Sequence, residues 1–201
     1  MQRKIFDVLA SAVGLVLVVV LLVAGGLLMW GYGFTTSNVK DQLAKQDIVF
    51  PTRAAFAQAK AGTEITPAMI PYLEKYAGEP MTTGAQAEAY ANHFIAIHLS
   101  EMPYGGVYAL VSAASRANPT NAALAGEVQT TFQGTTLRGL LLEAYAFSQF
   151  GLIALWGAIS AFVLAALLAL LVGLGFLHAR RTPKEEELAL RTENERELVN
   201  A

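Results

Sequence analysis

The sequence predicts an all-α membrane protein in which two transmembrane helices flank an extracytoplasmic helical bundle, followed by a short cytoplasmic helix or tail. Three observations support this fold class. The 201 residues are 54% hydrophobic and only 15% charged, whereas soluble domains carry about 25% charged residues. Two long stretches lack charged side chains. The region between them shows helix start and stop signals without the alternating pattern of strands.

Composition also excludes several classes of protein. The 14 basic and 16 acidic side chains give a formal net charge of −2, which argues against a nucleic-acid partner. The chain has no cysteine. Disulfides, thiolate metal sites and thiol catalysis are therefore excluded, as is the lipidated cysteine of a bacterial lipoprotein. The lipid bilayer is the expected surrounding of the apolar segments.

The first predicted transmembrane helix covers residues 8–30, after a cytoplasmic N-terminus of residues 1–7. Residues 8–29 carry no charge and would span roughly 33 Å as a helix, enough to cross the hydrocarbon core. A cleaved signal peptide is the alternative to a retained anchor. The anchor is favoured because the apolar run continues through residues 27–30, past the small residues 24–26 where a cleavage site would end it.

The second predicted transmembrane helix covers residues 149–178 and precedes a cytoplasmic tail of residues 179–201. Between Glu143 and Arg180 lie 36 residues with no formal charge, since His178 is counted as neutral. Such a stretch is too long and too uniformly apolar for an ordinary core helix.

Basic flanks and aromatic residues predict the orientation. Basic residues lie at the end of each span that is nearer to a chain terminus. They are Arg3, Lys4, Arg180, Arg181 and Lys184. By the positive-inside rule, they place both termini in the cytoplasm of a multi-pass plasma-membrane protein. The aromatic residues at the opposite boundary are Trp30, Tyr32, Phe34, Tyr145, Phe147 and Phe150. Such rings favour the headgroup layer, so they agree with this orientation.

The extracytoplasmic domain, residues 31–148, is predicted to consist of short helices. An alanine-rich helix follows Pro51 and stops at Gly62, and the next begins at Thr66 and Pro67 and ends at Gly78.

The best helix of this domain follows Thr83 and Gln86, which have the spacing of a capping box. Pro103 ends it, and another helix closes at Asn118. The last piece runs from about Asn121 towards the second span, and we allow for an interruption near Gly134.

Small residues recur on the predicted membrane helices at spacings that bring them to shared faces. Small side chains let two helix backbones approach closely in lipid. The residues concerned are Ala10, Gly14, Gly151, Ala154, Gly157, Ala158, Ala161 and Ala165. They predict packing between the two helices of this chain or, alternatively, against a membrane-protein partner or a second copy.

Candidates for catalysis or metal binding are few. His93 and His98 would be about 140° apart around an α-helix, so they do not chelate one ion as an i, i+4 pair does. His98 and Glu101 share a face and form at most half a metal site. Glu143 is expected to face water or a bundle partner, with a proton or cation entry point as the alternative. We predict no catalytic residue, no metal site and no cofactor.

Four segments carry a resemblance that covers nearly the whole chain. They read MQRKIFDVLASAVGLVLVV, GTEITPAMIPYLEKYAGE, AEAYANHFIAIHLSEMPYGGVYALVSAASRANP and GTTLRGLLLEAYAF. On these segments the chain resembles a family of small, uncharacterised two-span membrane proteins of actinobacteria. Some members carry an aromatic ring-opening dioxygenase label, a chemistry that needs a metal site. The resemblance implies the two-span architecture and no residue roles.

These features favour a non-catalytic accessory or assembly subunit of a larger membrane protein complex, respiratory or transport-related. The alternative is a receptor-like extracytoplasmic ligand-sensing module. Because the tail is short, a separate partner would have to carry its signal. A third reading is a metal-dependent enzyme that uses His93, His98 and Glu101.

Overall fold

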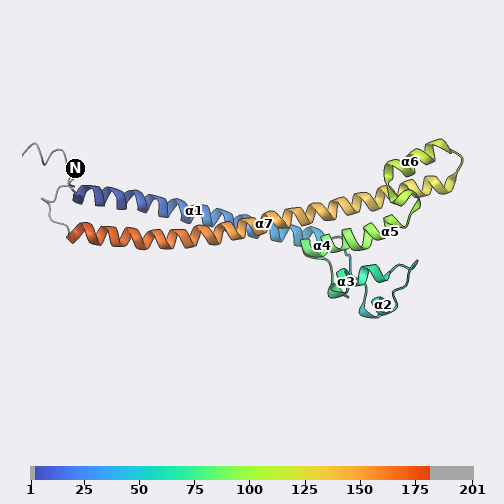
Figure 1. Ribbon diagram of the computed structural model, residues 1–201, viewed down its shortest axis with the longest axis horizontal. Helices are drawn as coiled ribbons and strands as arrows, with labels where there is room; N and C mark the ends of the chain where they lie inside the picture. Colours follow the sequence, from blue (N-terminus) through green and yellow to red (C-terminus); the bar gives the residue numbers. More distant parts are fainter. Residues whose placement is uncertain (1–2, 182–201) are drawn as a thin grey trace, which may run out of the picture. The chain divides into compact units, whose positions relative to one another are not determined.

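The computed structural model (Figure 1) describes residues 3–181, and every regular element in that part of the chain is a helix. Its one strand-like feature is an isolated antiparallel bridge between Val49 and Pro80. The prediction of an all-α fold is therefore confirmed for these residues. The remainder of the predicted tail, with Lys184, lies outside the described residues.

Two long helices and a series of short ones make up the described chain. The short helices all lie between the two long ones in the sequence. In chain order the helices are α1 (Arg3–Ala44), α2 (Arg53–Ala57), η1 (Pro67–Met69), α3 (Ile70–Leu73), η2 (Glu74–Tyr76), α4 (Gly84–Tyr90), η3 (Ala91–Ile95), α5 (Ala96–Ser100), η4 (Pro103–Gly106), α6 (Tyr108–Ala117) and α7 (Ala122–Arg181).

These helices form two compact units. Of the described residues, the first unit, called the helix pair, contains residues 3–30 and 155–181, and the second, called the bundle, consists of Gly31–Ala154. Helices α1 and α7 contribute a segment to each unit. The boundary after Trp30 coincides with the end that the sequence predicts for the first transmembrane helix. The boundary before Leu155 lies a few residues inside the second.

The helix pair contains the most apolar segments of the chain. Helices α1 and α7 are both long and apolar enough to cross a membrane, judged by length and composition. Only 17% of the most apolar stretch of each helix is buried, whereas the core helix of a soluble protein is mostly buried. Large side chains such as Val16, Leu27 and Leu170 are exposed instead. This pattern is compatible with insertion into lipid.

The bundle has a core of large apolar side chains. Its members come from α1, from α7 and from the segments between them. They are Val39, Leu43, Phe50, Phe56, Ile65, Met69, Leu73, Met81, Ala87, Ala89, Ala91, Ile95 and Leu141. Full burial of one large apolar side chain stabilises a fold by about 1.5–3 kcal/mol. This shared core therefore holds the short helices against the bundle segments of α1 and α7.

Local sequence signals set the starts of the short helices. The Thr83 hydroxyl accepts a hydrogen bond from the Gln86 backbone N–H at 3.2 Å, and the Gln86 side chain accepts one from the Thr83 N–H at 3.0 Å. This confirms the capping box at the start of α4. Thr66 also holds the N-cap position, before Pro67, but its hydroxyl makes no cap hydrogen bond. That hydroxyl is buried without a partner among the described residues.

The structure differs from the sequence-based expectation in several features. Helix α2 ends at Ala57, before the predicted stop at Gly62, and the next predicted helix is divided into η1, α3 and η2. The helix that follows Thr83 is not an α-helix throughout, because Ala91–Ile95 form a π-helical turn. The separation of about 140° between His93 and His98 was calculated for a regular α-helix, so it does not apply here. Helix α7 also runs without interruption through Gly134. A Cβ at Gly134 would lie 2.9 Å from Leu99 Cδ2, so this glycine allows α5 to approach α7 rather than breaking the helix.

Candidate functional site

Small residues form the contact surface inside the helix pair. On α7, Ala158, Ala161 and Ala165 are buried, and Ala158 has no exposed surface. Their spacing of three and four residues places them on one face of the helix. Small side chains on such a face allow two backbones to approach closely, which is how helices associate in lipid.

Four close approaches across the helix pair each join a glycine to a side chain of the opposite helix. Each distance runs from the position that a Cβ on the glycine would occupy to the nearest atom of the opposite side chain. The pairs are Gly14 and Val172 (2.6 Å), Gly25 and Phe162 (2.8 Å), Gly157 and Leu28 (3.2 Å), and Gly175 and Ser11 (2.5 Å). Residue numbers rise on α1 as they fall on α7, so the two segments run antiparallel (Figure 1). The small residues therefore pack between the two helices of this chain, the first of the two roles that the sequence left open.

Three of the predicted packing residues take other positions. Ala10 is exposed, and its neighbour Ser11 is buried in the contact. Gly151 and Ala154 belong to the bundle. Gly151 lies against Thr35 there, while Ala154 is half-buried. The small residues thus serve packing in both units.

The terminal end of the helix pair carries a crevice with a mixed lining of polar and apolar residues. Asp7, Ser11 and His178 help to line a cavity of about 260 Å³, and His178 Nε2 lies 3.9 Å from Asp7 Oδ2. The basic residues that predict the cytoplasmic side lie at this end. They are Arg3 and Lys4 in the first turn of α1, and Arg180 and Arg181 in the last turn of α7. A charged and polar helix end suits the boundary with water.

The aromatic residues predicted at the outer membrane boundary fall into two groups. The exposed ones are Trp30, Phe34, Phe147 and Phe150, and the half-buried ones are Tyr32 and Tyr145. Exposed rings are available to a headgroup layer, as the sequence predicts. The two half-buried tyrosines contribute to packing as well.

The bundle histidines contact different neighbours. The ring of His93 stacks on Tyr72, with centroids 3.5 Å apart and an interplanar angle of 1°. The Nδ1–H of His98 donates a hydrogen bond to the Phe94 carbonyl at 2.8 Å. Glu101 is exposed at the end of α5. Within the described part of the chain, no group of three or more histidine, aspartate or glutamate side chains is placed to hold a metal ion.

An aromatic cluster joins these histidines to the core. Tyr90 packs edge-on against Phe50 and stacks on Phe94, with centroid distances of 5.6 and 4.5 Å. Burial raises the pKa of Tyr90 above its ordinary value, and the negative charge of Glu64 raises it further. The phenol is therefore held in its neutral form at physiological pH.

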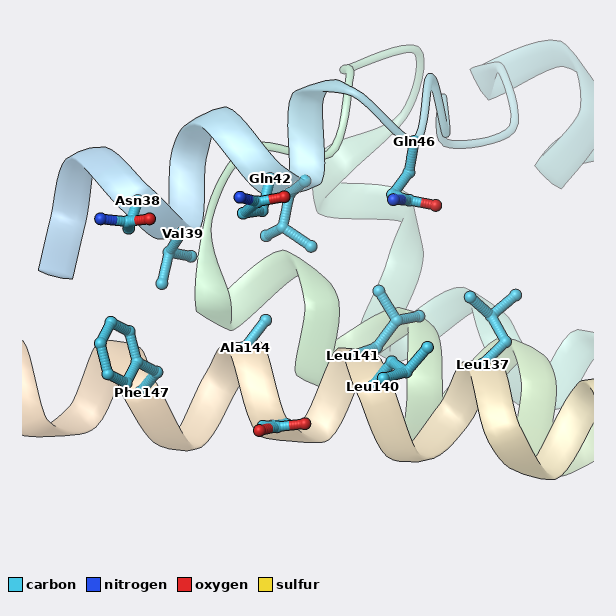
Figure 2. Close-up of a pocket in the computed structure, with 11 residues that line it drawn as sticks. Asn38, Val39, Gln42, Gln46, Leu137, Leu140, Leu141, Ala144 and Phe147 are labelled. Carbon is cyan, nitrogen blue, oxygen red and sulfur yellow. The ribbon is translucent and has the colours of Figure 1, made fainter.

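The bundle contains an open groove of about 380 Å³ between its segments of α1 and α7 (Figure 2). Its lining residues are Asn38, Val39, Gln42, Leu43, Gln46, Leu137, Leu140, Leu141, Glu143, Ala144 and Phe147. Figure 2 shows Val39 on one wall, and Ala144 and Phe147 on the other, pointing into the space between the helices. We call this feature the amide–leucine groove.

The two walls of the amide–leucine groove differ in chemistry. Asn38 and Gln42 are four residues apart on α1, and Gln46 lies in the turn that follows this helix, so three side-chain amides line this wall. The α7 wall is mainly apolar, and from Leu137 to Phe147 it is roughly 15 Å long at the rise of an α-helix. A groove of this length and polarity fits one amphipathic helix of about three turns.

No sequence pattern by itself predicted this groove. Its signals are the three amides of the first helix and the leucines at positions 137, 140 and 141, all visible in the sequence. The amides and the leucines face one another only because of the way in which the two helices pair in the bundle. Glu143, which the sequence placed near the outer membrane surface, is part of the lining.

No protein-family profile, no curated protein and no solved structure matches this chain. The resemblance to the small actinobacterial membrane proteins stays a prediction.

Proposed function

We propose that the protein crosses the membrane twice and serves as a non-catalytic accessory or assembly subunit of a larger membrane protein complex. The helix pair would lie in the bilayer with both termini in the cytoplasm, and the bundle would lie outside. The support for insertion is the outward-facing apolar surface of both long helices. The support for the orientation is the basic residues at the terminal end of the pair.

The observation that carries the subunit role is the amide–leucine groove. It is apolar over most of its lining, and Leu140 remains 58% exposed within it. An apolar surface left open in this way commonly marks a site of interaction with another protein. We infer that a helix of a membrane-protein partner lies in the groove, with its apolar face on the leucines and polar groups on the amides.

Purification of the tagged full-length protein from its native membranes in a mild detergent tests this function. We expect one membrane protein to co-purify in a fixed ratio and to be identified by mass spectrometry. The variant Leu140→Glu should lose this partner, because it puts a charge into the apolar wall. Leu110→Glu is the matched control, since Leu110 is 52% exposed on α6 and does not line the groove.

Two outcomes would contradict the subunit role. One is a monodisperse monomer without a partner, and the other is equal loss of the partner in both variants. A stable complex made only of copies of this chain would replace the foreign partner by a second copy.

The orientation has its own test, which the absence of native cysteine makes clean. A single cysteine at Thr63, an exposed residue of the bundle, should react with a membrane-impermeant maleimide in intact cells. A cysteine appended to the carboxyl end should react only after the cells are opened. The reverse pattern would overturn the proposed topology without bearing on the groove.

A further inference from the structure

A second cavity of the bundle shares no lining residue with the amide–leucine groove. It has a volume of about 320 Å³, and its lining residues are Ala96, Leu99, Gly105, Gly106, Val107, Tyr108, Thr135 and Arg138. Four segments build it, namely α5, the turn η4, the start of α6 and α7. We call it the Arg138 pocket. Its volume is at the lower end of the range for small-molecule sites.

The fold positions these walls by close backbone contacts. Residues Tyr104, Gly105 and Gly106 all have positive φ values of 57–64°, which turn the chain sharply after α5. Gly106 is buried against the Leu99 carbonyl, where a Cβ would clash. Tyr108 then packs against Phe132 of α7, with ring centroids 5.8 Å apart. The pocket is thus formed by ordered contacts on three sides.

Arg138 brings a positive charge to this pocket without an acidic partner. Its Nη2–H donates a hydrogen bond to Asn92 Oδ1 at 2.9 Å, and the Asn92 amide in turn donates to Glu88 at 2.8 Å. Asn92 therefore separates the guanidinium from the carboxylate. Among the described residues no carboxylate pairs directly with Arg138, and its Nε is buried without an acceptor. A carboxylate bound in the pocket would give the guanidinium the direct acidic partner that it lacks among these residues.

The other lining groups define what kind of anion fits. Thr135 and Tyr108 line the pocket, and neither hydroxyl has a hydrogen-bond partner among the described residues. Ala96, Leu99 and Val107 supply apolar walls. One formal positive charge matches a singly charged ligand better than a dianionic phosphate. The planar guanidinium suits the two oxygens of a carboxylate.

We propose that the Arg138 pocket binds a small monocarboxylate with a short apolar tail, its carboxylate on Arg138 and its tail against Ala96, Leu99 and Val107. The site lies entirely within the bundle and does not depend on a partner in the amide–leucine groove. Ligand binding at this pocket would give the bundle a sensing role in addition to the proposed subunit function.

Isothermal titration calorimetry on the full-length protein in detergent tests the proposal. Butyrate is the probe, because it is too short to partition strongly into micelles. Butyramide has the same shape without the charge, and inorganic phosphate is the competing anion. We expect saturable binding of butyrate and markedly weaker binding of both comparison compounds.

Variants locate the site. Arg138→Gln should raise the Kd of butyrate by at least about tenfold, since it removes a charge-assisted hydrogen bond. Arg116→Gln is the control, because Arg116 is exposed on α6 and bonds only to Ser112 among the described residues. Thr135→Val keeps the side-chain shape and Arg138 while removing one hydroxyl, so a smaller increase in Kd is expected even if Arg138→Gln misfolds.

Three results would overturn the proposal. They are no saturable binding of butyrate, equal binding of butyramide or phosphate, and an unchanged Kd in both Arg138→Gln and Thr135→Val when circular dichroism shows that these variants are folded. None of these results depends on whether a partner protein co-purifies. Failure of the ligand site is therefore distinguishable from failure of the subunit function.

Discussion

The helix pair and the bundle bury different sets of side chains: the pair buries alanines, valines and a serine, whereas the bundle buries aromatic and methionine side chains in addition to alanines. In the helix pair the buried residues include Ala158, Ala161 and Ala165, while leucines and valines are exposed. In the bundle the buried residues include Phe50 and Met69. Both units are built from helices, so the difference does not come from secondary structure.

A difference of this kind is expected if the bundle lies in water and the helix pair lies in lipid. In water, the removal of apolar surface drives large side chains inward, as in the bundle. In lipid that driving force between helices is absent, so small residues that allow close backbone contact occupy the interface and large apolar residues face the tails. The comparison therefore supports the proposed placement of the helix pair in the bilayer. Single substitutions in the helix pair or in the bundle can test this difference.

The largest effect is expected at Gly106, in the turn of the bundle. Gly106→Ala combines a positive φ with a clash against the Leu99 carbonyl, and should lower the free energy of unfolding by about 3 kcal/mol. Gly105→Ala is the matched control, because Gly105 has the same φ and no atom within 4 Å of its Cβ position. Thermal unfolding monitored by circular dichroism should separate the two variants. Equal destabilisation would show that backbone strain alone matters at this turn.

The next effect tests the helix pair. Ala165→Leu should destabilise it by about 2 kcal/mol, because a large side chain on the buried face forces the helices apart. Ala166→Leu changes the adjacent exposed alanine and should have little effect, since it faces lipid. Unfolding in mixed micelles of increasing SDS fraction measures both. If Ala166→Leu proved the more harmful variant, the assignment of the contact face would be wrong.

A smaller effect is expected from the capping threonines of the bundle. Thr83→Val removes the hydroxyl that caps α4 and should cost about 1 kcal/mol. Thr66→Val removes a buried hydroxyl that has no partner among the described residues, so it should be neutral or stabilising. Chemical or thermal unfolding of the two isosteric variants provides the comparison. A greater loss in Thr66→Val would mean that its hydroxyl is hydrogen-bonded in solution.

The smallest effect appears only at alkaline pH. Because burial and Glu64 raise the pKa of Tyr90 in the folded state, the folded protein holds the phenolic proton more tightly than the unfolded chain does. The resulting stability is fully present below the ordinary tyrosine pKa of about 10. It is lost as the pH rises from there through the raised value.

Tyr90→Phe should therefore match the original protein at neutral pH and lose less stability above pH ~10. Unfolding temperatures measured across that range provide the test, with Tyr104→Phe as the control at an exposed tyrosine. Parallel curves for the original protein and Tyr90→Phe would show that this phenol titrates normally in the fold.

The sequence alone predicted the features that depend on neighbouring residues. The length of the apolar runs, the capping box of Thr83 and Gln86 and the chain breaks at Pro103 and Asn118 all follow from local composition and spacing. These signals act over one or two helical turns and do not require knowledge of distant contacts. For that reason the helical class and most short helices were predictable.

Contacts between distant segments decided the rest. Gly134 reads as a possible helix break in the sequence, yet it lies in an unbroken helix, where its missing side chain leaves room for Leu99. The sequence left two roles open for the small residues, and only the antiparallel register of α1 and α7 in the helix pair assigns them to packing within the chain.

The same holds for the candidate sites. The amide–leucine groove and the Arg138 pocket each gather residues from segments far apart in the chain. A local sequence pattern does not predict that these distant residues lie close together. Their proximity depends on how the helices pair and on the core that holds the short helices. The sequence by itself therefore determined which segments are helical and how apolar each is. The tertiary structure decided which of their side chains face one another.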